Sequence, residues 1–494
     1  MKALRLAAGA ALSLLLLNAF GEQYYQTKMP YQPQQASASY EAAPQGYRPV
    51  YTQLLARHGS RGLSSFKTDL ALYNLWLQAA KANALTPLGK ELGPDMQALM
   101  KANFLLGYGV AGISKPGYGN ETMQGVTEHT QLARRLHQRL PELFDDIGDR
   151  RIVVVTSGKD RAVDSGYFFA RSLVAQQPDL APLISNPQAT DRFLLYFHKL
   201  NAKDDKVANA ADPLFATYQA SQAYQRWAKS PELKARTTAI LAQARVKTAA
   251  QATLARLFTP AFIAALDAGR YKATNTGTYS YTSADGKFTN TLSGDGGTKI
   301  ASATDAALAL YELYAATADM RVEVAADFTR YVQPEQAAVF ASAADAVAFY
   351  EKGPGIAENG NVTYGMARTL LADFFNEVDA IAKGDLAHAA KLRFAHAEIV
   401  MPMAAALGLP GMSEQLPRAT AYSYDNSAWR GEAVAPMAAN IQWDVYRNDQ
   451  GRTLVRMLYN EKETDFKPEC GGAKIAPASR YYDYAMLKNC YKLK

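Results

Sequence analysis

The stretch Leu54-Leu55-Ala56-Arg57-His58-Gly59-Ser60-Arg61-Gly62 places one histidine between two arginines, with little side-chain bulk around it. The mostly apolar run before it, residues 50–56, predicts a buried strand, and open α/β sheets bind ligands at the carboxyl ends of their strands. Two guanidinium groups can hold a phosphate through paired hydrogen bonds, and His58 beside them can attack phosphorus and carry it as a phosphohistidine. Gly59 would let the backbone approach such a ligand closely. The stretch therefore predicts an α/β fold with a phosphoryl-transfer site.

A second histidine and a carboxylate occur far along the chain, in Phe394-Ala395-His396-Ala397-Glu398. On a strand, alternation would aim His396 and Glu398 to the same side. Release of an alcohol from a phosphomonoester needs an acid at the leaving oxygen, and a carboxyl group near a phosphate can stay protonated for that purpose. Glu398 is therefore the candidate proton donor. The alternative is a histidine at the start of a helix followed by an exposed glutamate.

A third arginine follows another β-branched run. Residues 152–157 predict a buried strand that ends in Thr156 and Ser157, and the residues after Gly158 predict a turn and then a helix that contains Arg161. Arg161 would then lie at the carboxyl end of a second strand. The alternative is that Arg161 only pairs with a neighbouring aspartate.

These three patterns resemble the signatures of the histidine acid phosphatases, branch 2 of the histidine phosphatase superfamily. The family patterns Arg-His-Gly-x-Arg and Thr-Ser-x-x-x-Arg-x-x-x-Ser match here, and His-Ala-Glu in place of the usual His-Asp resembles the multiple inositol polyphosphate phosphatase group, which degrades phytate. Further stretches resemble that group, namely residues 125–129, 350–355, 401–409, 458–462 and 468–470. The resemblance is weakest over residues 201–347.

The resemblance implies a role for each matched residue. His58 would be the nucleophile and Glu398 the proton donor, and the transferring phosphate would be held by four side chains: Arg57, Arg61, Arg161 and His396. Lys67 could replace a basic residue that often follows the first motif, or it could be an ordinary surface lysine. The proline usual in that motif is absent, since Gly62-Leu63 stands there. The chemistry needs no cofactor, and the histidines do not show the spacing of metal ligands, so no metal is expected.

The start of the chain has the layout of a secretory signal peptide. A short basic segment precedes an apolar run, residues 6–17, and small residues follow it, so residues 1–21 are predicted to be removed on export to the periplasm or the medium. An uncleaved membrane helix is the alternative. After removal of the signal we expect no membrane association. The chain has two cysteines, Cys470 and Cys490, which would pair in an oxidising compartment or else remain as buried thiols.

The rest of the chain divides by composition. Residues 22–48 predict a flexible lead-in, residues 49–195 and 375–494 an α/β core, and residues 196–374 a mostly helical insertion. By the resemblance, the active site would lie in the cleft between core and insertion. Residues 441–446 and 453–458 predict a hairpin, and residues 269–297 a loop or short hairpin.

The formal net charge of +7 favours an anionic partner. We expect a small polyphosphorylated substrate, since the chain carries no pattern typical of nucleic-acid readers. The sequence is thus interpreted as an exported phosphatase of phytate and lower inositol phosphates. Three alternatives remain: a broad acid or sugar-phosphate phosphatase of the same fold, a mutase-like relative, and a non-catalytic binding protein for phosphate esters.

Overall fold

The computed structural model describes residues 24–492, and the predicted signal peptide therefore lies outside the described residues. Its centre is a seven-stranded sheet with the order β10-β9-β8-β1-β7-β2, in which β11 also pairs with β9. Strands β1, β7 and β2 are parallel, whereas β8 to β11 are antiparallel additions at one side. The strand bounds are β1 Tyr47–Arg57, β2 Arg151–Thr156, β7 His388–Ala395, β8 Asn440–Asn448, β9 Thr453–Tyr459, β10 Lys462–Glu463 and β11 Tyr481–Asp483. The predicted α/β class is confirmed.

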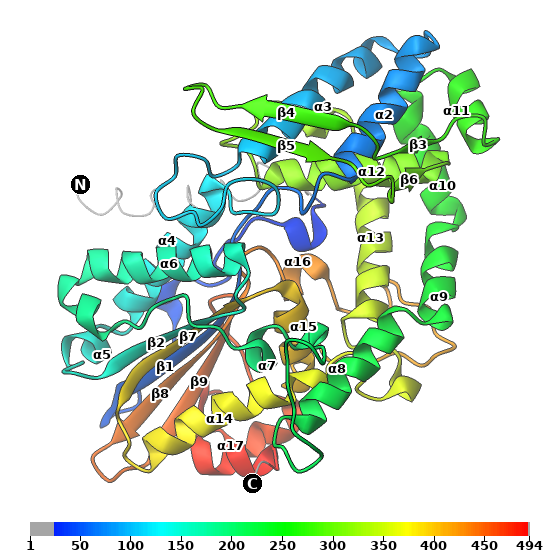
Figure 1. Ribbon diagram of the computed structural model, residues 1–494. Coiled ribbons are helices and arrows are strands. Elements are labelled where there is room, and N and C mark those ends of the chain that lie inside the picture. The colour runs from blue at the N-terminus through cyan, green and yellow to red at the C-terminus, as the bar shows by residue number, and fades with distance from the viewer. Residues whose placement is uncertain (1–23, 493–494) are drawn as a thin grey trace, which may run out of the picture.

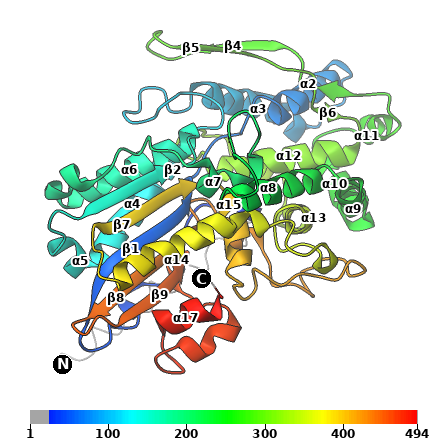
Figure 2. The ribbon, with the colours of Figure 1, turned by 60° about the horizontal axis from the view of Figure 1, so that its bottom comes forward.

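Helices cover both faces of this sheet (Figures 1 and 2). On one face, Leu136 and Phe169 pack against Ile152 and Phe394 of the sheet. On the other face, Phe374 belongs to the cluster that contains Trp443 and Leu55. A strand buried on both faces needs a nearly continuous apolar sequence, which explains the β-branched runs. The covering helices are α4 Met123–Arg139, α5 Pro141–Asp145 and α6 Asp160–Gln176 on the first face, with α14 Arg368–Ala382, α15 Ala397–Ala406 and α17 Tyr484–Cys490 on the second.

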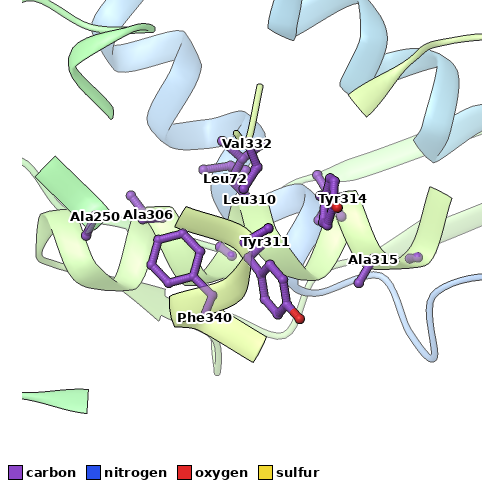
Figure 3. Close-up of a cluster of buried hydrophobic side chains, with 14 of the residues drawn as sticks. Leu72, Ala250, Ala306, Leu310, Tyr311, Tyr314, Ala315, Val332 and Phe340 are labelled. Carbon is purple, nitrogen blue, oxygen red and sulfur yellow. The ribbon is translucent and has the colours of Figure 1, made fainter. Parts of the chain in front are cut away.

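A second, mostly helical body adjoins the sheet. Its centre is α12, which is buried on most sides and packs with Leu310 among Leu72, Ala250 and Phe340 of three other helices (Figure 3). Small alanine side chains let these helices approach α12 closely. The helices of this body are α2 Thr68–Lys81, α3 Pro87–Leu105, α8 Phe215–Ala228, α9 Pro231–Leu241, α10 Ala244–Ala255, α11 Pro260–Asp267, α12 Ala303–Ala318 and α13 Pro334–Glu351, and the short helices between the bodies are α7 Arg192–Leu195 and α16 Gly431–Val434.

The division of the chain between the two bodies differs from the predicted one. Helices α2 and α3 bury Leu72, Leu75 and Met96 in the helical body, although they fall within the predicted core segment 49–195. Their apolar faces match those of α10 and α12, which lie far away in the sequence. A division of the chain into consecutive segments could not show that one body is built from two separate parts.

The predicted flexible lead-in is also wrong for its described part, residues 24–48. Tyr25 packs against Tyr314 with 5.0 Å between ring centres, and Tyr31 is buried and donates a 2.8 Å hydrogen bond to Glu461. The Met29 carbonyl accepts from the Met437 amide at 2.9 Å. The segment looked disordered because it is rich in Gln, Pro and Ser, but its tyrosines supply the aromatic area that packing requires.

Two smaller predictions are confirmed. Strands β8 and β9 form the hairpin expected from residues 441–458, and β4 Thr278–Thr282 pairs with β5 Thr289–Ser293 as the short hairpin within residues 269–297. The short strands β3 Ala273–Thr274 and β6 Lys299–Ile300 pair at its base.

The two cysteines form a disulfide, Cys470–Cys490, which ties α17 to the preceding turn. Within residues 24–492 we find no helix with the length and apolar character needed to span a bilayer.

Candidate active site

The three sequence patterns meet at one edge of the sheet. Strands β1, β7 and β2 are adjacent and parallel, with Arg57 opposite Ala395 and Thr156 opposite Phe394. Their carboxyl ends therefore lie side by side, and the loops that follow carry the predicted site residues. The rings of His58 and His396 lie 5.5 Å apart between centres. Arg57, Arg61 and Arg161 all act electrostatically on His58.

The geometry of His58 fixes which ring nitrogen is available. Its Nδ1 lies 2.9 Å from the Gly59 carbonyl, and a carbonyl can only accept, so Nδ1 carries the proton. The Nε2 lone pair is then free. Burial and the nearby positive charges of Arg161, Arg57 and Arg61 hold the pKa of His58 well below its usual range. His58 is therefore a neutral imidazole with a fixed tautomer.

The three arginines lack a full set of partners, although Arg57 is buried and Arg61 and Arg161 are half-buried. The Nη1 of Arg57 donates to the carbonyls of Thr27 and Ala435, but the Nε atoms of Arg57, Arg61 and Arg161 have no hydrogen-bond partner among the described residues. Burial and mutual repulsion lower the pKa values of Arg57 and Arg161 to about 10. A cluster of cations with buried, unused Nε donors is suited to a multivalent anion.

His396 and Glu398 reach the site from the start of a helix, as in the alternative to the expected strand. Strand β7 ends at Ala395, His396 caps the N-terminus of α15, and Glu398 lies in the first turn of that helix, so the expected strand alternation is wrong. The His396 Nε2 lies 2.8 Å from the Ser157 hydroxyl, and its Nδ1 has no partner among the described residues. Burial and the positive charge of Arg161 hold the pKa of His396 well below its usual value.

Glu398 forms an ion pair with Lys352 at the end of α13, with 3.1 Å between Nζ and Oε1. Burial opposes ionisation of Glu398, but Lys352, His198 and His396 outweigh it and hold the pKa of Glu398 well below its usual range. In the free protein this carboxyl group is thus a carboxylate. Lys352 lies in the stretch 350–355 that resembled the family, but no chemistry in the sequence singled it out.

The loop that carries His58 is held residue by residue through its backbone. His129 Nε2 lies 3.1 Å from the Arg57 carbonyl, the Gly59 amide donates to Glu121 at 2.9 Å, and the Ser60 amide donates to Glu128 at 2.7 Å. Burial lowers the pKa of His129 to about 3 and raises the pKa values of both glutamates. These buried groups fix the backbone of the loop that carries His58.

Gly59 is required by a close approach to another backbone. A Cβ atom built on Gly59 would lie 2.6 Å from the Cα of Gly125 at the start of α4, and a Cβ on Gly125 would lie 2.3 Å from the Ser60 carbonyl oxygen. The sequence predicted close approach of a ligand at Gly59. The structure shows that it also lets α4 pack directly under the loop, so that Glu128 and His129 can reach it.

Two further charged residues lie at the site. Asp319 accepts from the Ser60 hydroxyl at 2.9 Å and is fully buried, with a pKa held well above its usual value by burial and by the nearby Glu128. Lys28 comes from the N-terminal segment, and burial together with the charges of Arg61 and Arg57 lowers its pKa even though Glu312 opposes this. Neither residue is in a recognisable motif, and Lys28 lies in the segment expected to be flexible.

Lys67 is placed differently from the other predicted residues. It forms a 3.0 Å ion pair with Asp295 near the base of the β4–β5 hairpin, and both side chains are about half exposed. Within the described residues it makes no hydrogen bond to the arginines or histidines of the site. Among residues 24–492 no cluster of histidine, cysteine, aspartate or glutamate is arranged to hold a metal ion.

The fold and this cluster are those of a phosphatase-like protein. Comparison with known proteins identifies the family. The model of the histidine phosphatase superfamily, branch 2, matches residues 51–460, and the chain belongs to this family. A comparison with curated proteins gives no match.

Comparison with solved structures shows which phosphatases this chain resembles. The multiple inositol polyphosphate phosphatase of Bifidobacterium longum in complex with phosphate is 35% identical, with a TM-score of 0.84 over 95% of this chain and 97% of that chain. Its complex with inositol hexasulfate gives a TM-score of 0.82 over the same shares. The phytase from D. castellii, at 15% identity and a TM-score of 0.59 over 95% of this chain and 84% of that chain, shares the fold.

Proposed function

We propose that this protein is an exported phosphatase that hydrolyses phytate and lower inositol phosphates through a phosphohistidine at His58. The observation that carries this proposal is the state of His58, a neutral imidazole with Nε2 free, surrounded by three arginines that have unused donors. A protein that only bound phosphate esters would need the arginines. It would need neither an oriented nucleophile nor a carboxyl group beside it.

In the first step, Nε2 of His58 attacks phosphorus and the bond between phosphorus and the ester oxygen breaks. Negative charge is spread over the nonbridging oxygens in this transition state, and Arg57, Arg61 and Arg161 are placed to stabilise it. The leaving oxygen takes a proton from Glu398. Because Glu398 is ionised in the free protein, it gains that proton at acid pH or from the bound substrate.

In the second step, water attacks the phosphorus of the phosphohistidine and the nitrogen–phosphorus bond breaks. Glu398, now a carboxylate, accepts the proton from water, and His58 regains its free Nε2 lone pair. The sum is water plus ester giving alcohol plus inorganic phosphate, and no other reactant is needed.

The substrate assignment rests on the resemblance and on charge. The similar protein of Bifidobacterium longum is named for inositol polyphosphates and has been solved with inositol hexasulfate. Export rests on the signal-like residues 1–21, and the Cys470–Cys490 disulfide is compatible with an oxidising compartment. Assay of purified protein on phytate and on a simple sugar phosphate separates this proposal from that of a broad phosphatase.

The role of Glu398 is tested with leaving groups of different quality. We expect Glu398→Gln to lower kcat/KM on phytate by about 100-fold or more, since an inositol oxygen needs protonation, and to lower kcat/KM on p-nitrophenyl phosphate much less. The comparison uses kcat/KM because this ratio excludes the second step, which both substrates share. Steady-state rates on both substrates give the ratio. An equal loss on both substrates would show that Glu398 is not the acid.

A further inference from the structure

A mostly apolar pocket of about 470 Å³ lies beside the start of α4. Its walls are the C-terminal half of α3, the loop of residues 106–113, the first residues of α4 and the segment that follows α12. Neither the histidines nor the arginines of the candidate active site line it, so the two sites are separate. The volume is in the range of small-molecule sites in proteins.

Apolar side chains dominate this pocket and continue onto the surface. Leu105, Ile113 and Val126 line it together with Met123 and Val322. Met123 and Val322 are two of the few large apolar side chains that are exposed within residues 24–492, and Val322 is 68% exposed. Exposed apolar groups that surround a concave site favour a ligand whose own apolar surface leaves water on binding.

Two carboxyl groups supply the polar part of the pocket. Glu121 is buried and Glu323 is half-buried, and the Oε2 atom of each is buried without a hydrogen-bond partner in the described part of the chain. Their Oε1 atoms are occupied, since Glu121 accepts from the Gly59 amide at 2.9 Å and Glu323 accepts from the Met123 amide at 2.8 Å. A buried acceptor without a partner costs free energy, which a ligand that donates a hydrogen bond would recover.

The charge of the pocket favours a cation over an anion. Burial raises the pKa of Glu121 and that of Glu323, and an ammonium group beside them would stabilise their ionised forms. Lys101 is the one cation among the lining residues, and its side chain is exposed to solvent. A charge-assisted hydrogen bond to a carboxylate is stronger than one between neutral groups.

We propose that this pocket binds a small amine, whose aromatic or aliphatic body contacts the apolar side chains and whose ammonium group donates to Glu121 and Glu323. This inference goes beyond the proposed function and does not depend on it. Glu121 also pairs with Arg61 as an isolated antiparallel bridge, and the Thr122 amide donates to the Ser60 carbonyl at 3.0 Å. The bound amine would therefore contact the segment that holds the loop of His58.

The probe is 2-phenylethylamine, and its binding to the mature protein is measured by isothermal titration calorimetry. We expect one site with a Kd below about 1 mM. The alcohol 2-phenylethanol has the same apolar body without the charge, and it should bind at least about tenfold more weakly. Equal affinities for the amine and the alcohol, or no binding of the amine, would overturn the proposal.

Two variants test whether the amine lies in this pocket. Ala102 lines the pocket, so the larger side chain of Ala102→Trp should fill it and abolish binding, whereas Ala239→Trp at an exposed position of α9 should not change the Kd. Glu323→Gln keeps an oxygen that can accept from the Met123 amide but removes the charge, and it should raise the Kd about tenfold. The matched control is Glu335→Gln, at an exposed position of α13.

The outcome does not depend on turnover, because the titration measures binding alone. Circular dichroism shows whether each variant is folded, and Glu323→Gln decides the question if Ala102→Trp does not fold. An unchanged Kd of the amine in Glu323→Gln would mean that the amine binds elsewhere and would overturn the proposal. A protein that binds the amine as expected but does not hydrolyse phytate would contradict the proposed function and leave the amine site established.

Discussion

In the proposed mechanism, the reactivity of His58 depends on groups that do not touch the substrate. The Gly59 carbonyl fixes its tautomer, and three buried side chains, Glu121, Glu128 and His129, hold the backbone on which it sits. The positive charges that are placed to bind the phosphate also keep the imidazole neutral. The arginines would therefore both bind the phosphate and keep His58 neutral. Two of them, Arg57 and Arg61, belong to the same short motif as His58.

The protonation states of His58 and Glu398 predict an acid optimum. The proposed mechanism requires His58 without a proton on Nε2 and Glu398 with a proton. Both pKa values are lowered, that of His58 by burial and the arginines, and that of Glu398 by Lys352 and two histidines against burial. His58 thus stays neutral in acid, while Glu398 is protonated only there.

Lys352→Met should move the basic limb of kcat/KM to higher pH by about one unit, because loss of the ammonium leaves burial to raise the pKa of Glu398. The measurement is the pH profile of kcat/KM for a simple sugar phosphate, whose poor leaving group needs the acid, in the wild type and the variant. Lys352→Arg keeps the charge and serves as the control. A limb that stays in place or moves to lower pH would contradict this account of Glu398.

At the scale of elements, adjacency of β1, β7 and β2 brings the site together. The apolar runs predicted β1 and β2 but not the full extent of β7, and the resemblance predicted the site residues after them. Sequence reasoning did not predict that β7 stops before His396, since a short apolar run does not mark where a strand becomes a helix. It also missed Lys28, Asp319 and Lys352, because their role depends on neighbours that are distant in the chain.

The N-terminal segment shows why composition was a poor guide. Tyr25 is buried in the helical body, so Tyr25→Ala should lower the free energy of unfolding by about 3 kcal/mol. Urea denaturation followed by circular dichroism measures this change. Gln32→Ala, at an exposed position of the same segment, should have almost no effect. A flexible lead-in would give no loss for either variant.

At the scale of the whole molecule, the site joins parts of both bodies. The segments that follow the sheet strands supply His58, Arg161 and His396, whereas the helical body supplies Lys352 and Asp319. The N-terminal segment adds Lys28, which acts electrostatically with Asp319 and Arg61. The proposed catalytic cluster is therefore complete only in the fully folded chain.

The most direct measurement is the trapping of the covalent intermediate. Glu398→Gln, which lacks the base for the second step, is mixed with radiolabelled aryl phosphate and quenched in alkali, where a nitrogen–phosphorus bond survives. The account predicts about one label per chain on the peptide that contains His58, and none in a His58→Ala/Glu398→Gln double variant. Release of phosphate by the wild type, with no label on His58 in the single variant, would contradict it.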